Sequence, residues 1–359
     1  MVLRATITID EAKIRDNAAR VHAMLPGIEI IGVTKVTCGD PRVARAMLDG
    51  GCVGVGESRL ENIERLRASG IDTRYWLIRS PVPGLAEETI RLADTSLISE
   101  AVVATALSEA AVAAGRVHDI IAMIDVGDLR EGMLPDSLPA FLVHVAGLPG
   151  VRLAGLGTSL TCYGGIVPSA ENLGELAELA RDASIRLGRD LIVSGGMSSS
   201  IELGEAGEMP RGITNLRIGE SILLGVSTVT RHPLPGLHTD AFVLSAPVIE
   251  CELKPSAPMG VTAQDAFGGV PSFEDLGMRR RAILAIGRQD VDPAGIRPLE
   301  PGVRVLGASS DHLVLDVHDM PEPPEPGDAL TFVPNYSATL RLFSSAYVTK
   351  EYACDRRGE

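Results

Sequence analysis

Ile28-Glu-Ile-Ile-Gly-Val-Thr-Lys35 is a mostly apolar run that ends in a lysine. Such a run is typical of a strand in a parallel sheet that is buried on both faces. An amphipathic pattern over residues 41–50 follows it and predicts a helix. The same alternation of a short apolar run and a helical pattern then repeats along the chain. Ile120-Ile-Ala-Met-Ile124 is a second strand of this kind.

The alternation predicts eight strand-then-helix units. Strands are expected near residues 28–34, 52–55, 74–78, 94–97, 119–125, 151–157, 191–194 and 214–218. Helices are expected near residues 41–50, 58–68, 83–92, 99–114, 136–147, 169–186 and 199–207, and from Glu220 onward. Eight units in about 200–250 residues favour a (β/α)8 TIM-like barrel of the α/β class over an open sheet.

We assign residues 1–232 to this barrel, including an early helix over residues 11–24. A strand at 6–9 precedes that helix, and it can instead join the second domain. After the linker-like Arg231-His-Pro-Leu-Pro-Gly, residues 233–359 are predicted to form a C-terminal all-β domain. Its strands are expected at 241–253, 281–287, 303–307, 312–317 and 328–333.

The composition excludes several function classes. Of 359 residues, 45% are apolar, which is enough for a sizeable core. The net charge of −14 and the lack of a basic run disfavour nucleic acid and anionic membranes as partners. The start at Met1 has no signal-peptide pattern, and no run is long enough to span a membrane. Five scattered cysteines, including Cys354, predict a cytoplasmic protein with reduced thiols and no metal site.

Active sites of these barrels lie at the carboxyl ends of the strands. Lys35 ends the first barrel strand, where burial can make a lysine a usable nucleophile or base. Two turns rich in glycine and serine follow the seventh and eighth strands, at 194–200 and 217–221. Turns at these two positions often bind phosphate through backbone N–H groups and hydroxyls. The sequence therefore predicts a phosphate-bearing ligand beside a reactive lysine.

Three further groups are expected at the barrel mouth. Arg217 ends the eighth strand, and beside a pyridine nitrogen it would keep that nitrogen unprotonated. Arg130 follows the fifth strand and can bind a carboxylate or phenolate oxygen. Ser159 and Tyr163 follow the sixth strand and can line the pocket. The residues alone leave two readings open: a Schiff base with pyridoxal phosphate, or a Schiff-base aldolase acting on a sugar phosphate.

The chain resembles the alanine-racemase-like, fold-type III pyridoxal-phosphate enzymes over essentially its whole length, and within them the ornithine racemase branch. The stretches that carry the resemblance are Thr8-Ile-Asp…Asn17, Gly32-Val-Thr-Lys35-Val, Gly56-Glu-Ser-Arg59, Asp125-Val-Gly-Asp-Leu-Arg130-Glu-Gly, Gly157-Thr-Ser-Leu-Thr-Cys-Tyr-Gly164, Ser194-Gly-Gly-Met-Ser-Ser-Ser200, Asn215-Leu-Arg-Ile-Gly-Glu220, Ala285-Ile-Gly-Arg-Gln-Asp-Val-Asp-Pro293 and Leu306-Gly-Ala-Ser-Ser-Asp-His-Leu313.

The resemblance implies a pyridoxal-phosphate-dependent amino acid racemase that binds a small-molecule amino acid substrate and works as a homodimer. The partner's β domain is then expected to close each barrel mouth. Lys35 matches the lysine that bonds the cofactor. Ser198, with the backbone of Gly219 and Glu220, matches the phosphate cradle. Arg217 matches the arginine at the pyridine nitrogen, and Arg130 matches the one beside the phenolate.

Three departures from the alanine enzymes matter. Met123 stands where they carry a lysine that can be carbamylated, and Ser159 aligns with their histidine. Their second catalytic base, a tyrosine in Gly-Tyr-x-Asp, is missing from Gly287-Arg-Gln-Asp290. The missing tyrosine disfavours small neutral alanine as the substrate, and the resemblance to the ornithine racemase branch implies ornithine or a related basic amino acid.

Two assignments depend on these departures. The candidates for the second base are Asp311, His312, Cys162, Tyr163, Tyr336 and Tyr347. We favour Asp311 because it lies in the β-domain segment expected to cover the partner's barrel mouth. The candidates for binding a distal ammonium group are Asp128, Glu131, Asp290 and Asp311. Two other functions remain open: a non-catalytic pyridoxal-phosphate carrier, and a lyase of the same fold such as a D-hydroxy-amino-acid aldolase.

Overall fold

The computed structural model describes residues 4–353. Within them the chain forms two compact units. One runs from Glu11 to Thr239, and the other joins the segment up to Asp10 to the residues from Asp240 onward. Met1 and Cys354, which the sequence predictions used, lie outside the described residues. In the described part, no helix combines the length and the hydropathy needed to cross a membrane.

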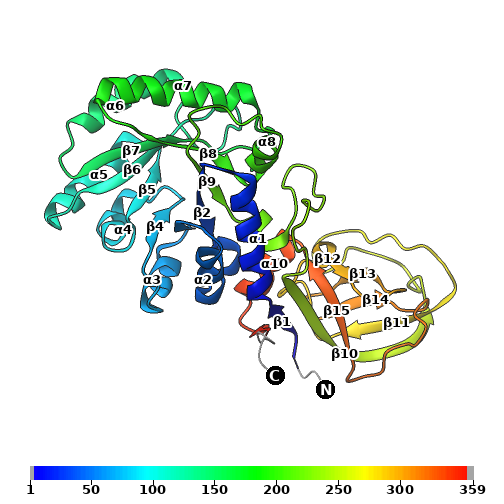
Figure 1. Ribbon diagram of the computed structural model, residues 1–359. Coiled ribbons are helices and arrows are strands. Elements are labelled where there is room, and N and C mark those ends of the chain that lie inside the picture. Colours follow the sequence, from blue (N-terminus) through cyan, green and yellow to red (C-terminus); the bar gives the residue numbers. More distant parts are fainter. Residues whose placement is uncertain (1–3, 354–359) are drawn as a thin grey trace, which may run out of the picture. The chain divides into compact units, whose positions relative to one another are not determined.

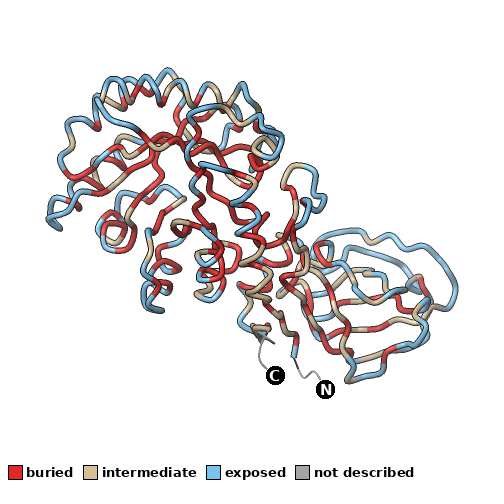
Figure 2. Tube along the Cα trace, in the orientation of Figure 1, coloured by how far each residue is buried: buried red, intermediate tan, exposed pale blue. Residues whose placement is uncertain are grey.

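The first of these units, which we call the barrel unit, contains a closed barrel of eight parallel strands (Figure 1). They are β2 (Glu29–Val33), β3 (Gly54–Glu57), β4 (Arg74–Leu77), β5 (Thr95–Ile98), β6 (His118–Met123), β7 (Val151–Gly157), β8 (Ile192–Met197) and β9 (Asn215–Ile218). Pairing of β9 with β2 closes the barrel. Figure 2 shows the barrel strands as mostly buried, as expected for apolar strands covered on both faces. The predicted (β/α)8 barrel is confirmed.

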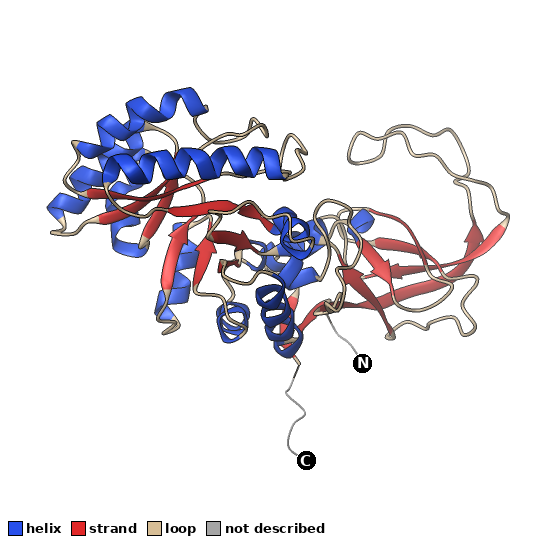
Figure 3. Ribbon diagram, turned by 45° about the horizontal axis from the view of Figure 1, so that its top comes forward, coloured by secondary structure: helices blue, strands red, loops and turns tan. Residues whose placement is uncertain are grey.

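Helices alternate with these strands (Figure 3). They are α1 (Glu11–Met24), α2 (Pro41–Asp49), α3 (Leu60–Ala68), α4 (Ala86–Leu92), α5 (Ala101–Ala113), α6 (Leu138–Ala146), α7 (Ala170–Leu187), α8 (Ile201–Glu205) and α9 (Glu220–Leu224). Local sequence sets several of their starts. Asp40 caps α2 by accepting from Arg42 N at 2.9 Å and Val43 N at 3.0 Å. Ser169 and Asn172 form a capping box at α7.

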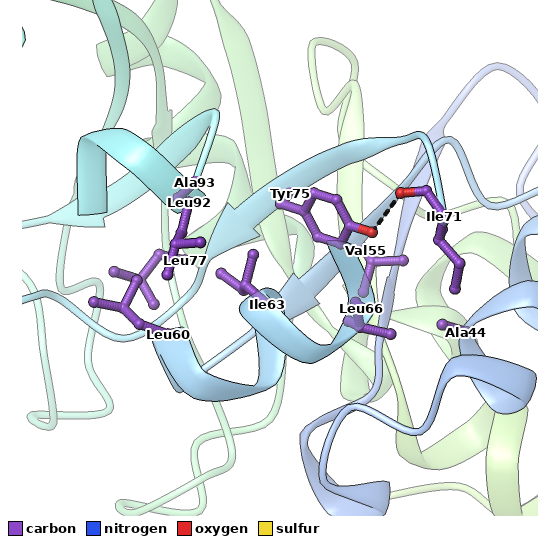
Figure 4. Packing of buried hydrophobic residues seen from close by; sticks show 10 residues of the cluster. All are labelled: Ala44, Val55, Leu60, Ile63, Leu66, Ile71, Tyr75, Leu77, Leu92 and Ala93. Carbon is purple, nitrogen blue, oxygen red and sulfur yellow. Dashed lines mark hydrogen bonds between the residues drawn. The ribbon is translucent and has the colours of Figure 1, made fainter. Parts of the chain in front are cut away.

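Two neighbouring aromatic residues on β4 show how the barrel unit is layered. Tyr75 packs in a cluster that connects α3 with β3 and β4, and its hydroxyl donates to Ile71 O at 2.8 Å (Figure 4). Trp76 packs in a different cluster with Ile31, Leu97, Ile121 and Met123, which come from the three barrel strands β2, β5 and β6. Because successive residues of a strand point to opposite faces, β4 supplies one aromatic side chain to each layer.

The other unit, which we call the β unit, is built on an eight-stranded sheet. Its strands are β1 (Thr6–Ile9), β10 (Phe242–Pro255), β11 (Met278–Leu284), β12 (Ile296–Pro298), β13 (Arg304–Ala308), β14 (Leu313–Asp316), β15 (Ala329–Pro334) and β16 (Thr349–Tyr352). The order β12-β15-β10-β11-β14-β13 is antiparallel throughout. At one side of this sheet, β1 pairs antiparallel with β10 and parallel with β16.

The sequence did not predict three elements of the β unit: β12, β16 and the helix α10 (Tyr336–Ser344). The side chain of Asn335 caps this helix by accepting from Ala338 N at 3.1 Å. Leu342 and Phe343 bury its apolar side, and the Phe343 ring packs edge-on against Phe242 of β10 with centroids 5.7 Å apart. The predicted β domain therefore carries one packed helix.

Candidate active site

A cavity of about 410 Å³ opens among residues that end or follow the barrel strands. This volume is in the range of small-molecule sites, about 300–1,000 Å³. Four residues singled out from the sequence line it together: Lys35, Arg130, Ser159 and Arg217. Ser198, Gly219 and Glu220 are not among its lining residues.

Lys35 begins the short turn η1 (Lys35–Thr37) that directly follows β2. The residue before it, Thr34, is fully buried, and its hydroxyl donates to Glu57 Oε1 at 2.6 Å. The Thr34 carbonyl accepts from Thr37 N at 3.0 Å. These bonds fix the backbone at the end of β2, so the Lys35 side chain starts from a fixed point beside the cavity.

Glu57, at the end of β3, is a buried carboxyl group next to this turn. It also accepts from Asn62 Nδ2 at 3.0 Å and from Ser58 N at 3.2 Å. Burial raises the pKa of Glu57, against the opposing effect of these hydrogen bonds and of the Lys35 charge. A perturbed carboxyl group beside a basic residue is characteristic of functional sites.

Arg217 is 3% exposed and lies in β9. Its guanidinium donates to Thr158 O at 2.6 Å, to Ser159 Oγ at 3.3 Å and to the hydroxyl of Ser194. Within residues 4–353, no carboxylate forms an ion pair with it. Desolvation therefore lowers the pKa of Arg217 to about 10, and the group stays charged at neutral pH. The barrel thus holds a buried positive charge with neutral acceptors only.

The two turns predicted to bind phosphate come together in space. The hydroxyl of Ser198 accepts from Ser221 N at 3.3 Å, which links the turn after β8 to the start of α9. The neighbouring hydroxyl of Ser199 is buried and has no hydrogen-bond partner among the described residues. At Gly219, a Cβ atom would lie 2.7 Å from Val33 O, so only glycine fits there.

The structure differs from the sequence prediction at β8. This strand continues to Met197, three residues past its expected end, so the turn begins at Ser198 rather than at Ser194. The pairing of β8 with β9 is irregular between Ser194 and Met197, which allows the glycine pair within this stretch to remain in the strand. Glu220 is placed at the start of α9, where its side chain pairs with Arg231 at 2.6 Å. Burial raises the pKa of the Glu220 carboxyl.

Arg130 and Glu131 lie in a closed loop between β6 and α6. A backbone bridge joins Ile124 and Met133 at its base. Asp125 Oδ1 accepts from Gly127 N at 2.8 Å and shapes its first turn. At the tip, Nε and one terminal nitrogen of Arg130 donate to the two carboxylate oxygens of Glu131. Both side chains line the cavity.

The remaining candidates lie elsewhere. Asp128 is buried, and its oxygens accept from Tyr163 N at 3.1 Å and Ile166 N at 3.4 Å. It therefore joins the loops after β6 and β7, and the Tyr163 side chain is exposed. Asp311 lies on the exposed turn between β13 and β14, where it accepts from Ser310 Oγ at 2.7 Å.

The sequence reasoning missed several lining residues that directly follow barrel strands. Ser58 follows β3, Arg79 and Ser80 follow β4, and Ser99 follows β5. The signal that could have found them was available, because the carboxyl-end rule applies to all eight strands.

Fold and cavity together place a candidate small-molecule site at the mouth of a (β/α)8 barrel. The family described as "Alanine racemase, N-terminal domain" matches residues 9–226. Ornithine racemase of Acetoanaerobium sticklandii is 39% identical over 349 residues, which covers 96% of this chain and 98% of that protein. Lysine racemase of Thermotoga maritima shows the same identity and coverage. The chain therefore belongs to the alanine racemase family, and the resemblance stated from the sequence is confirmed.

Solved structures show the same fold. Alanine racemase from Streptomyces lavendulae matches with a TM-score of 0.74 and 21% identity, covering 98% of both chains. Alanine racemase from Bartonella henselae, solved with covalently bound pyridoxal phosphate, matches with a TM-score of 0.74 and 15% identity, covering 98% of this chain and all of that one. Both matches extend beyond the barrel into the β unit.

Proposed function

We propose that this chain is a pyridoxal-phosphate-dependent racemase of ornithine or a related basic amino acid. The observation that carries the proposal is the cavity at the barrel mouth, where Lys35, Arg130 and Arg217 meet. The identity of 39% to racemases of ornithine and of lysine supports the substrate class.

The residues at the barrel mouth fit pyridoxal phosphate. Lys35 provides a primary amine in the cavity lining. The unpartnered buried hydroxyl of Ser199, next to Ser198, offers a donor to a phosphate oxygen. Gly219, whose position only glycine can occupy because Val33 of β2 packs against it, precedes the first backbone N–H groups of α9, and these can donate to an anion.

When bound, pyridoxal phosphate supplies acidification of the Cα–H of the amino acid joined to it. Lys35 would carry the group covalently and hold or release a proton at Nζ. Ser198 and the backbone of Gly219 and Glu220 would bind its phosphate. Arg217 can only donate hydrogen bonds, so it would keep the ring nitrogen unprotonated, with Ser159 helping to orient it.

Two roles remain, binding of the phenolate oxygen and the second base. Arg130 would bind the phenolate oxygen through N–H groups that Glu131 does not occupy. Racemisation removes the Cα proton on one face and returns a proton on the other, so a second base is needed opposite Lys35. We assign this role to Asp311 of the second subunit in a homodimer, because Asp311 is exposed on its turn.

The test is to incubate the purified, cofactor-loaded protein in deuterium oxide with L-ornithine, L-lysine, L-arginine, L-serine and L-alanine. Deuterium incorporation at Cα and chiral composition are followed together. The proposal expects incorporation with loss of optical purity for ornithine or lysine, and much less for alanine. Exchange of none of the five by protein that holds its cofactor would contradict it and favour a carrier.

A further inference from the structure

Glu131 is the single acidic residue among the described residues that line the cavity. Four basic residues, Lys35, Arg79, Arg130 and Arg217, line the same space. A cofactor phosphate and an α-carboxylate suit such a set of charges. A substrate side chain that ends in an ammonium group does not, unless a carboxylate faces it.

Other carboxylates near the barrel mouth already accept hydrogen bonds or form ion pairs within the chain. Glu57 is fully buried, and both of its oxygens accept hydrogen bonds. Asp125 and Asp128 accept from backbone N–H groups of the two loops. Glu220 pairs with Arg231. None of these four lines the cavity.

Glu131 is free to bind a further donor. An ionised carboxylate offers about four lone-pair sites, and the two hydrogen bonds from Arg130 use two of them. The side chain of Glu131 is 37% exposed, so its remaining sites are accessible. The contact with Arg130 restrains the orientation of the carboxylate.

The walls near this carboxylate suit a hydrocarbon stem. Ile78, Leu97, Ile98, Met123 and Met197 line the cavity with aliphatic or thioether groups. Met123 and Leu97 are each 2% exposed and belong to the barrel core, so these walls are fixed. An apolar wall with one carboxylate is the environment that a flexible chain ending in an ammonium group needs.

We propose that Glu131 binds the distal ammonium group of a diamino acid substrate and thereby selects basic over neutral amino acids. This inference rests on the proposed function and adds the residue that recognises the end of the substrate side chain. The carboxylate accepts from the ammonium while Arg130 remains paired with it, so the three groups form a cation–anion–cation chain at the loop tip.

The test compares L-ornithine with L-norleucine, which carries a methyl group where ornithine has its ammonium. The variant Glu131→Gln keeps the shape and removes the charge. We expect the ratio of kcat/KM for ornithine to that for norleucine to fall by about 10- to 100-fold, the effect of one hydrogen bond between charged groups. Glu131→Asp should restore part of the ratio. Asp136→Asn, which changes an exposed carboxylate in the same connection, is the matched control.

A second readout does not depend on turnover. The rise in Tm that ornithine causes in the cofactor-loaded protein should shrink in Glu131→Gln, and the rise caused by norleucine should not shrink in parallel. An unchanged ratio in Glu131→Gln would overturn the inference. If both rates fall equally, Glu131 acts through Arg130 instead, and that outcome overturns it as well. If the unsubstituted protein racemises no amino acid, the proposed function fails, which is a distinguishable result.

Discussion

Arg217 in the barrel unit and Asp316 in the β unit are both 3% exposed, but only the charge of Asp316 is neutralised by ion pairs. Arg217 has only neutral acceptors, and its pKa falls to about 10. For Asp316, burial alone would raise the pKa, but hydrogen bonds from Arg279, His318 N and Arg304 outweigh it and lower the pKa to about 2.

This difference in charge neutralisation distinguishes a buried charge that stabilises the fold from one that is available to a ligand. The β unit surrounds its buried charge with opposite charges, so Asp316 stabilises the fold. The barrel buries a cation without neutralising it, which costs stability and leaves a fixed charge for a bound group. We therefore expect Arg217 to serve the reaction rather than the fold.

The largest effect is expected at Arg217. Arg217→Gln should lower kcat/KM for racemisation by at least about 100-fold, because it removes a fixed charge at the reacting centre. Stability should change much less, since no ion pair is lost. Racemisation rate and Tm are measured together. Arg152→Gln breaks an exposed ion pair with Asp119 on the same barrel and should leave the rate unchanged. Activity of Arg217→Gln within threefold of the unsubstituted protein would contradict the view that the charge of Arg217 serves the reaction.

A smaller effect, on stability, is expected at Asp316. Its folded pKa lies below the unfolded value of 3.8, so its contribution is present above about pH 4 and is lost as the pH falls through 2. Asp316→Asn should lower the free energy of unfolding by about 2 kcal/mol at neutral pH. Urea denaturation at pH 7 and at pH 3 measures this. A difference that is as large at pH 3 as at pH 7 would show that ionisation is not the cause.

The smallest effect is expected at His118, a buried group at the start of β6, away from the carboxyl ends of the strands. Burial lowers the pKa of His118 to about 4, and its ring lies 2.9 Å from Ser96 Oγ. The unfolded chain binds this proton more readily, so stability should fall as the pH drops below about 6.5. Between pH 7 and 5.5 we expect a loss of about 1 kcal/mol that His118→Gln abolishes. An equal loss in the variant would assign the pH dependence to other groups.

The sequence predicted the barrel because its strands are short apolar runs with local patterns. All eight of them were expected within a few residues of their observed ends. The pairing of β16 with β1 joins the two ends of the described chain, and no local pattern carries such a contact. The helix α10 was missed because Thr339 and the aromatic residues Tyr336 and Phe343 have low intrinsic helix propensity.

At the site, the sequence could predict which residues lie at the barrel mouth, but not which hydrogen-bond partners their side chains have. Lys35, Arg130, Ser159 and Arg217 line one cavity because strand order and the carboxyl-end rule place them there. The choice among four candidate carboxylates depended on side-chain contacts instead. Only the structure shows that Asp128 binds backbone N–H groups while Glu131 faces the cavity.

The central claim is that Lys35 carries the cofactor at the barrel mouth. The chain has four lysines, Lys13, Lys35, Lys254 and Lys350, and Lys35 alone lines the cavity. The most direct measurement is borohydride reduction of the cofactor-loaded protein, followed by peptide mass spectrometry to locate the pyridoxyl group. The account predicts the group on Lys35 and its loss in Lys35→Ala. A pyridoxyl group on any of the other three lysines, with none on Lys35, would contradict it.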